Sequence, residues 1–331
     1  MGQGITQLSI TTAPFVSSGL STRRLMWEVA LALVPVVAVA TWYFGVTALL
    51  VIFACAFGSV VTEWSFSADR RSLGSLLDGS ALLTGVLLAL TLPPSIPLWM
   101  AFLGGVVAVA LGKSIWGGLG QNLFNPALVG RAFLQAAFPV TMTTWSPPRE
   151  GLLHLDASTL AAPLMHVADA TTTATPLGLA KFEGTVTDAL PLLMGNIGGC
   201  LGETSSLVLI VCGLYLAIRR VFDWRLAVST LLTVAVFSQV LHWINPEAFP
   251  GATFMLLSGG LLFGAVFMVT DPVSTPITLR GAWIFGVGVG LLVVLIRLFG
   301  GLPEGVMYSI LLMNSVTPLI NRYTQPRRFG G

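Results

Sequence analysis

The chain has 331 residues, of which 55% are hydrophobic and only 9% are charged, and its formal net charge is +2. A water-soluble domain of this length cannot cover its surface with so few charges, so the composition indicates a polytopic membrane protein. The small net charge argues against a nucleic-acid partner. Cys55, Cys200 and Cys212 show no CxxC spacing, which argues against an iron–sulfur or zinc site.

Hydrophobic runs close to the length of a bilayer-spanning helix recur along the chain. They predict an all-α fold with about ten transmembrane helices, near residues 25–43, 46–64, 79–93, 97–113, 124–139, 203–219, 225–244, 253–270, 281–299 and 304–320. The third range stops at Pro93-Pro94 and the fifth begins in a turn rich in Gly and Asn. We therefore expect both to be discontinuous rather than straight rods.

Most of the 16 basic residues fall in alternate loops between the predicted spans. Positive charge is retained on the cytoplasmic side of membrane proteins. The pattern therefore predicts that both termini are cytoplasmic and that residues 140–202 lie on the outer side. This divides the chain into residues 1–139, an outer loop at 140–202, and residues 203–331.

Five small or helix-breaking residues recur in the same order and at one constant offset. Gly85, Thr91, Pro93, Ser95 and Pro97 match Gly264, Thr270, Pro272, Ser274 and Pro276. With five spans in each half, such a duplication predicts two five-helix repeats of inverted topology, whose broken third and eighth spans meet near the bilayer centre. Chance recurrence of Gly and Pro is the alternative. The repeat alone also suits a channel or a secondary transporter.

Residues 117–131 combine several glycines with Asn122 and Asn125. Glycine lets the backbone approach a planar ligand, and an amide both donates and accepts hydrogen bonds. These groups suit the heterocyclic edge of an isoalloxazine ring. A helix start, capped by Asn and with Pro126 in the first helical position, explains the same residues.

Charged residues at or inside the predicted spans have two interpretations as well. Asp271 ends the eighth span, where an acid serves either as a cation or proton relay or as a residue wetted by the interface. Glu63, Glu203 and Glu304 also lie at span ends and are interpreted as interfacial. Arg131 and Arg297 fall within spans and require partners or solvent.

The only long polar segment carries a threonine-rich stretch that ends in Thr173, Ala174, Thr175 and Pro176. A hydroxyl in a water-exposed loop can be esterified by a phosphate-bearing cofactor, but most Ser/Thr-rich stretches are simply solvated loops. No Ser-His-Asp order or pair of carboxylates supports a hydrolase. We expect no catalytic residue and no metal site in this chain.

Several of these segments together resemble the NqrB/RnfD family of membrane flavin subunits, from the first span to the end of the chain. The resemblance is carried by residues 78–85, 117–131, 174–177, 202–203 and 270–273. It implies FMN linked by a phosphoester to Thr175, with Thr173 as a second hydroxyl where the family motif is variable. It also implies non-covalent riboflavin near Asn122 and Asn125, with Gly120 and Gly85 as further contacts. The inverted five-helix repeat of urea channels has the same architecture.

The resemblance further implies an electron-carrying subunit of a translocase, inactive alone, in a bacterial cytoplasmic (inner) membrane. The parent complex is a ferredoxin:NAD oxidoreductase of the Rnf type that moves Na⁺ or H⁺. Expected partners are the A-, B-, C-, E- and G-like subunits, above all the G-like FMN subunit and the A/E-like membrane subunits. The alternatives are an NqrB-like subunit of a Na⁺-pumping quinone reductase, or a channel or transporter. Asp271 is the candidate for the ion path.

Overall fold

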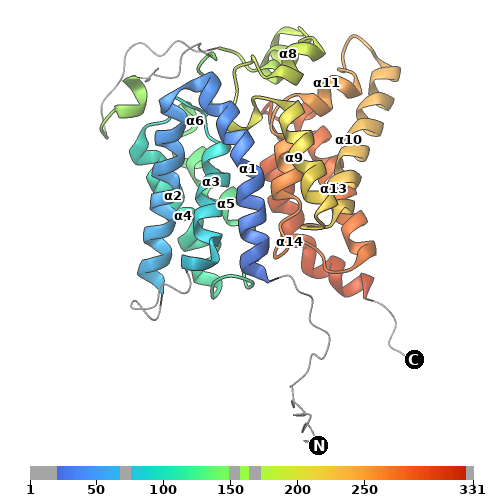
Figure 1. Cartoon of the computed structure of the whole chain (residues 1–331). Helices are drawn as coiled ribbons and strands as arrows, with labels where there is room; N and C mark the ends of the chain where they lie inside the picture. Colours follow the sequence, from blue (N-terminus) through green and yellow to red (C-terminus); the bar gives the residue numbers. More distant parts are fainter. Residues whose placement is uncertain (1–20, 68–75, 149–156, 164–172, 326–331) are drawn as a thin grey trace, which may run out of the picture.

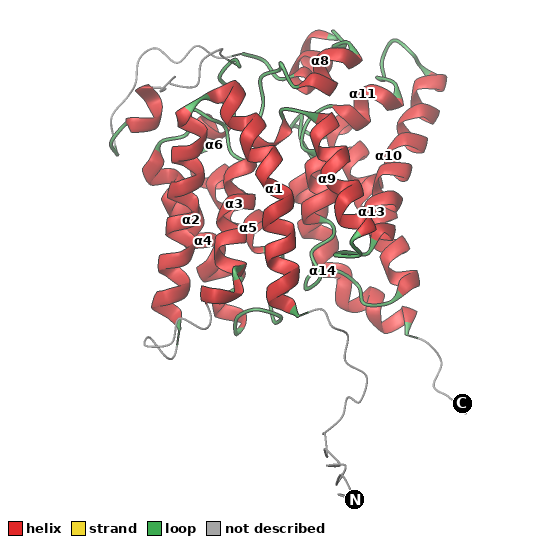
Figure 2. Cartoon of the chain, viewed as in Figure 1, coloured by secondary structure: helices red, strands yellow, loops and turns green. Residues whose placement is uncertain are grey.

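The computed structural model describes residues 21–67, 76–148, 157–163 and 173–325. In this part of the chain all regular structure is helical and no strand occurs (Figure 2). The prediction of an all-α protein is confirmed.

The helices of the first part run up and down the bundle, with a 3₁₀ turn before α3 and a short helix after α5 (Figure 1). They are α1 (Thr22–Phe44), α2 (Val46–Phe66), α3 (Ser80–Leu90), α4 (Leu98–Gly112), α5 (Pro126–Ala137) and α6 (Pro139–Met142). The predicted ranges match α1 to α5 to within a few residues. Hydrophobic runs locate these helices well because each run must bury its backbone polar groups within itself.

The second part begins with short elements, of which α8 lies at one end of the bundle (Figure 1). They are α7 (Pro176–Gly178), η4 (Leu179–Glu183), α8 (Ala189–Met194) and η5 (Leu201–Glu203). The longer helices follow: α9 (Ser206–Ile218), α10 (Trp224–Ile244), α13 (Leu279–Phe299) and α14 (Val306–Thr324). Between α10 and α13 the chain forms α11 (Ala252–Leu257), α12 (Leu261–Phe263) and η6 (Gly264–Met268).

Five of the described helices are long and apolar enough to cross a membrane: α1, α2, the α4 segment to Trp116, α10 and α13. Two shorter apolar helices, α3 and α9, accompany them. Large apolar side chains such as Phe53 and Ile218 point away from the protein, with exposed fractions of 68% and 80%. Apolar surface of this kind is stable in lipid and not in water. The chain is therefore a multi-pass membrane protein.

Two of the predicted spans are interrupted. α3 ends at Leu90 and is followed by an irregular turn through Pro93 and Pro94 before α4 begins. The eighth predicted range is split at Ser258–Gly260, where Gly259 has a φ of +64°, a value that favours glycine. Only non-helical backbone that is buried in protein is tolerated at membrane depth, and Leu92 and Ser258 are fully buried.

Glycines allow the closest helix pairs to approach. Gly85 of α3 faces α2 so closely that an added Cβ would lie 2.5 Å from the Cα of Ala56. Gly105 of α4 packs on the carbonyl oxygen of Cys55 in α2. In the second part, Gly286 and Gly290 of α13 pack on α10 in the same manner. Small residues hold membrane helices together through close backbone contact.

The bundle has two distinct ends (Figure 1). The first residues of α1 and the last residues of α14 lie at one end, whereas α8 and α11 lie at the opposite end. Two cavities, one towards each end, contain the residues that the sequence singles out.

Candidate functional site

Thr175 begins the short helical segment that α7 and η4 form together. Its backbone is extended, Pro176 occupies the first helical position, and its hydroxyl accepts a hydrogen bond from the N–H of Gly178 at 3.1 Å. This is the standard start of a helix, in which a Thr oxygen satisfies one of the unpaired N–H groups. Thr175 is half-buried, so its hydroxyl is held in place without being sealed from solvent.

Thr173, two residues before Thr175, is bonded to the backbone of Trp145. The N–H of Thr173 donates to the carbonyl oxygen of Trp145 at 2.9 Å, and its hydroxyl donates to the same oxygen at 3.4 Å. Thr172, which precedes Thr173 in the threonine-rich stretch and begins the segment that resembles the family's FMN motif, lies outside the described residues. The side chain of Thr173 is therefore engaged with the backbone, whereas the hydroxyl of Thr175 has a lone pair left over.

A cavity of about 540 Å³ opens beside these two threonines, and we call it the threonine cavity. Its lining combines aromatic and apolar side chains with a few polar groups, among them Arg131, Gln135, Trp145 and Tyr308. Small-molecule sites typically have volumes of about 300–1,000 Å³ and this mixture of side chains. The space and the chemistry fit a flavin ring that is attached to the wall.

Lys181 fixes the helical segment over the cavity. Its ammonium group donates to three backbone carbonyls that follow or end α13, those of Arg297, Gly300 and Leu302. The carboxyl end of a helix attracts cations because its last carbonyls are unpaired. Burial lowers the pKa of Lys181 below its ordinary value. The wall that carries Thr175 is thus tied to the end of a membrane helix.

Behind the threonine cavity lies a group of ionisable side chains, which we call the acid–base cluster: Arg131, Cys200, Glu203, Arg297 and Glu304. Arg131 donates to Glu304 at 2.5 Å. Arg297 donates to the carbonyl oxygens of Met255 and Ser258 at 2.7 and 3.0 Å. Both intramembrane arginines therefore have the partners that the sequence required.

The interpretation of the span-end acids as interfacial is wrong for two of them. Glu203 is only 7% exposed and faces Glu304 within the protein. Glu63 is 8% exposed and binds the ammonium group of Lys113 at 2.7 Å. The two buried arginines were the signal for the Glu304 contact, since a buried cation needs an anion. Nothing in the sequence indicated that Glu203 would join them.

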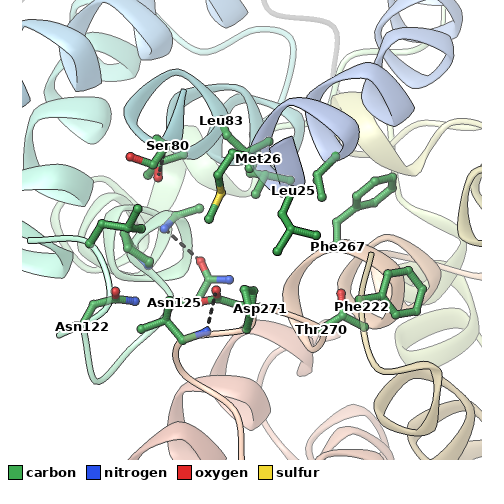
Figure 3. Close-up of a pocket in the computed structure, with 18 of the residues that line it drawn as sticks. Leu25, Met26, Ser80, Leu83, Asn122, Asn125, Phe222, Phe267, Thr270 and Asp271 are labelled. Carbon is green, nitrogen blue, oxygen red and sulfur yellow. Dashed lines mark hydrogen bonds between the residues drawn. The ribbon is translucent and has the colours of Figure 1, made fainter. Parts of the chain in front are cut away.

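The second cavity, the asparagine cavity, lies where α1, α3 and α5 approach η6 and the segment after it (Figure 3). Asn122 and Asn125 enter from the loop before α5, and Thr270 and Asp271 from the segment after η6. The cavity has a volume of about 80 Å³. This is well below the roughly 300 Å³ of a typical small-molecule site, so lining side chains must move to admit a flavin ring.

The two asparagines are already engaged with the backbone. Asn125 caps α5 by accepting from the N–H of Ala127 at 3.0 Å, and its amide N–H donates to the carbonyl of Met268 at 3.4 Å. Asn122 donates to the carbonyl of Phe124 at 3.1 Å. The helix-cap interpretation of Asn125 is confirmed, and the same side chain also lines the cavity.

Charged groups are present at the asparagine cavity too. Lys113, which lines it, donates to Glu63 and at 2.5 Å to the hydroxyl of Ser80. Asp271 accepts from the hydroxyl of Ser274 at 2.8 Å and from the N–H of Val273 at 3.3 Å. Asp271 thus stabilises its own turn while one side of it faces the cavity.

The two glycines predicted as flavin contacts lie in different settings. Gly120 belongs to the loop that carries Asn122 and has a φ of +92°, which explains a glycine there whatever binds. Gly85 faces α2, as described above, rather than the residues that line the asparagine cavity.

These features together define an all-α, multi-pass membrane protein with a ligand-sized cavity at one end and, towards the other, a smaller cavity lined mainly by apolar side chains with a few polar ones. The family model of the NQR2, RnfD, RnfE family matches residues 9–330. The chain belongs to this family.

Named relatives cover nearly the whole chain. It is 43% identical to the D subunit of the proton-translocating ferredoxin:NAD(+) oxidoreductase complex of Clostridium ljungdahlii, over 97% of this chain and 96% of the relative. It is 41% identical to the Na(+)-translocating counterpart of Acetobacterium woodii, over 98% and 95%. It is also 41% identical to the D subunit of the ion-translocating oxidoreductase complex of Stutzerimonas stutzeri, over 94% and 92%.

Proposed function

We propose that this chain is the D subunit of an ion-translocating ferredoxin:NAD oxidoreductase complex. In this role it carries electrons within the membrane and couples their passage to the movement of Na⁺ or H⁺. Relatives of nearly equal length bear that name with either ion. The observation that carries the proposal is the 540 Å³ threonine cavity, because it provides room for a redox group next to an anchored Thr hydroxyl.

FMN is the proposed occupant of the threonine cavity, with its phosphate esterified to Thr175. Thr175 is half-buried, and its hydroxyl is fixed by the N–H of Gly178. The ring would lie among the aromatic and polar side chains that include Trp145, Tyr308 and Gln135. Arg131 supplies positive charge at the base of this space. The chemistry that such a group supplies when bound is reversible transfer of one or two electrons.

Riboflavin is the proposed occupant of the asparagine cavity. Asn122 and Asn125 provide amide donors and acceptors, and the cation Lys113 lies on the same lining. The cavity has to widen for a ring to enter. We expect Leu25, Met26 and Phe222, apolar side chains of its lining (Figure 3), to move first, because they have no side-chain hydrogen bonds to lose.

The inverted repeat is part of the proposal. In each half a glycine-bearing helix packs closely on an earlier one, α4 on α2 and α13 on α10. The interrupted segments after α3 and around η6 are the corresponding elements of the two halves. We place the termini in the cytoplasm and residues 140–202 on the outer side, as the distribution of basic residues favours.

Ion movement follows from the cost of charge in a dry bundle. An electron that enters a low-dielectric site is stabilised by the arrival of a cation nearby. Asp271 lies on the asparagine cavity beside the interrupted segment after η6, where it can hold such a cation. The A-, B-, C-, E- and G-like subunits, above all the G-like FMN subunit and the A/E-like membrane subunits, are the proposed partners for electron and ion transfer.

Flavin fluorescence of the denatured protein tests the proposal. The complex is purified, denatured and separated on a gel, where covalent flavin remains with its chain. We expect fluorescence in this chain for the wild type and for Thr173→Val, the neighbouring hydroxyl, and none for Thr175→Ala. Fluorescence that persists in Thr175→Ala rules out attachment there. A wild-type chain without any flavin favours the channel or transporter alternative.

Riboflavin requires a separate measurement. Flavin released from the denatured complex without phosphate is quantified by chromatography. We expect its amount to fall in Asn122→Leu while covalent flavin is retained. Asn245→Leu, at the end of α10 and away from the asparagine cavity, is the matched control. Equal riboflavin in both variants places the ligand elsewhere.

A further inference from the structure

The acid–base cluster brings together side chains from four separate parts of the chain. Glu203 ends η5, Glu304 precedes α14, Arg131 lies in α5 and Arg297 lies near the end of α13. One carboxylate oxygen of Glu203, one of Glu304 and the sulfur of Cys200 lie within 4.8 Å of one another. Two acids that are distant in sequence therefore share one buried site.

The two acids differ in their partners. Glu304 accepts from Arg131 at 2.5 Å and from the N–H of Gly260 at 3.2 Å. The two terminal nitrogens of Arg297 donate to backbone carbonyls rather than to either acid. Glu203 is 7% exposed, and its Oε1 is buried without any hydrogen-bond partner. The donors of the cluster thus stabilise a negative charge on Glu304, while Glu203 lacks comparable support.

Apart from the weak thiol donor of Cys200, no donor supports a charge on Glu203. A buried carboxylate with so little support is strongly disfavoured, and a second carboxylate nearby makes it worse. Such a pair relieves the repulsion by holding one proton between its members. The same three groups have the ligand types of a metal site. A divalent metal ion would add two positive charges beside two guanidinium groups, whereas a proton adds only one, so the charges favour a proton.

We propose that Glu203 and Glu304 form a proton-binding pair, in which Glu203 carries the proton and donates it in a hydrogen bond to Glu304. Release of this proton leaves two carboxylates facing two guanidinium groups. Binding restores one carboxyl group and one carboxylate. Arg131, Arg297 and Cys200 are the other ionisable groups of the described residues that face the pair.

The position of the pair connects it to the threonine cavity. A cavity of about 20 Å³ touches both acids and Arg131, enough for one water molecule. Arg131, Glu304 and Met307 line both this space and the threonine cavity. A negative charge that arrives in the threonine cavity therefore favours binding of the proton by the pair. When that charge leaves, release of the proton is favoured, so one proton is bound or released for each charge. This coupling between the proton and the charge in the threonine cavity rests on the proposed function, whereas the pair itself does not.

Isosteric substitution tests the location of the proton. Gln has the shape of a protonated Glu and also donates a hydrogen bond, so the Glu203→Gln complex should melt at the wild-type temperature. Glu304→Gln leaves Arg131 as a buried cation without its anion and should lower the melting temperature clearly. An equal fall in melting temperature in both variants overturns the assignment of the proton to Glu203, because Glu203 would then be ionised.

Infrared spectra of the purified complex provide the second readout. A protonated carboxyl group has a C=O stretching band apart from those of carboxylates, and the band shifts when H₂O is replaced by D₂O. We expect such a band in the wild type and in Glu247→Gln, a control at an exposed acid, and its loss in Glu203→Gln. A band that survives in Glu203→Gln overturns the proposal.

The Thr175→Ala complex distinguishes a failure of the proton pair from a failure of the proposed function. Its Glu203 band should persist without covalent flavin, because the pair depends on the protein alone. If the wild-type chain proves free of flavin but the band is present, only the proposed function fails. If flavin is present and the band is absent, only the proton pair fails.

Discussion

The threonine cavity and the asparagine cavity both contain hydrogen-bonded polar groups, but they differ in the room beside those groups. At the threonine cavity the volume is about 540 Å³, and the polar side chains surround open space. At the asparagine cavity the volume is about 80 Å³, and Asn122, Asn125 and Asp271 are bonded to neighbouring backbone. The first cavity has room for a large ligand, whereas lining side chains of the second must move before a large ligand can enter.

This difference matters for the two proposed flavins. A group that is attached covalently needs permanent room beside its attachment point, and the threonine cavity provides it. A group held only by contacts can replace hydrogen bonds and side chains that fill the site in its absence. Occupancy of the threonine cavity should therefore depend on one hydroxyl, whereas occupancy of the asparagine cavity should depend on many small contributions.

The largest effect on stability is expected at the base of the threonine cavity. Arg131→Met leaves Glu304 without its cationic partner. The loss should be about 3 kcal/mol, the lower end of the range for a broken buried pair, because the Glu304 side chain keeps 23% exposure. Arg225→Met, which breaks an ion pair whose side chains are each 31% exposed, should cost about 0–1 kcal/mol. Thermal unfolding of the purified complex measures both, and equal losses would show that burial of the Arg131 pair adds nothing.

Hydrophobic runs predicted α1 to α5 closely because a membrane helix must be apolar along its whole length. The break after α3 was visible as Pro93-Pro94, and the start of α5 as Asn125-Pro126. The acid–base cluster was not predicted, because Arg131, Glu203 and Glu304 meet only through packing of separate helices. Local sequence places a charge at a span end, but the tertiary structure decides whether water reaches it.

The same distinction applies to the cavities. The threonine stretch indicated a place for attachment, but the room beside it comes from residues 301–308 and from α5. The asparagines indicated either a helix cap or ring contacts, and in the structure Asn125 caps α5 and also lines a cavity. Residue types in the sequence indicated which polar groups could bind a ligand, but they did not indicate the volume of either cavity.

A smaller effect is expected at Gly85, where ligand contact and helix packing predict different results. An added Cβ would lie 2.5 Å from the Cα of Ala56, so Gly85→Ala must push α3 away from α2 at a cost of about 1–3 kcal/mol. Gly251→Ala, where a Cβ meets nothing within 4 Å, is the control and should leave stability almost unchanged. Lower stability with normal riboflavin content identifies packing as the role of Gly85. Normal stability with lost riboflavin identifies a ligand contact.

Lys181 offers a milder change to the wall of the threonine cavity. Lys181→Met keeps the apolar stem but removes the hydrogen bonds to the carbonyls of Arg297, Gly300 and Leu302. The local cost should be about 1–2 kcal/mol, and the wall that carries Thr175 should loosen. We expect lower FMN occupancy at Thr175 by peptide mass spectrometry and unchanged riboflavin. A fall in riboflavin of equal size would show that the two cavities are not independent.

The smallest effect on stability is expected at Asp271, where substitution should change ion movement alone. In asparagine the amide oxygen can accept from the N–H of Val273, as Oδ1 of Asp271 does, and the amide N–H can donate to the hydroxyl oxygen of Ser274 in place of the bond to Oδ2. Asp271→Asn should therefore fold normally and retain both flavins. It removes the negative charge that faces the asparagine cavity. The number of ions moved per electron, measured in proteoliposomes, should therefore fall while electron transfer continues. Asp223→Asn is the matched control, since Asp223 also accepts from the backbone at a helix start but lines neither cavity. An unchanged ratio in Asp271→Asn removes this carboxylate from the ion path and leaves it as a turn-stabilising residue.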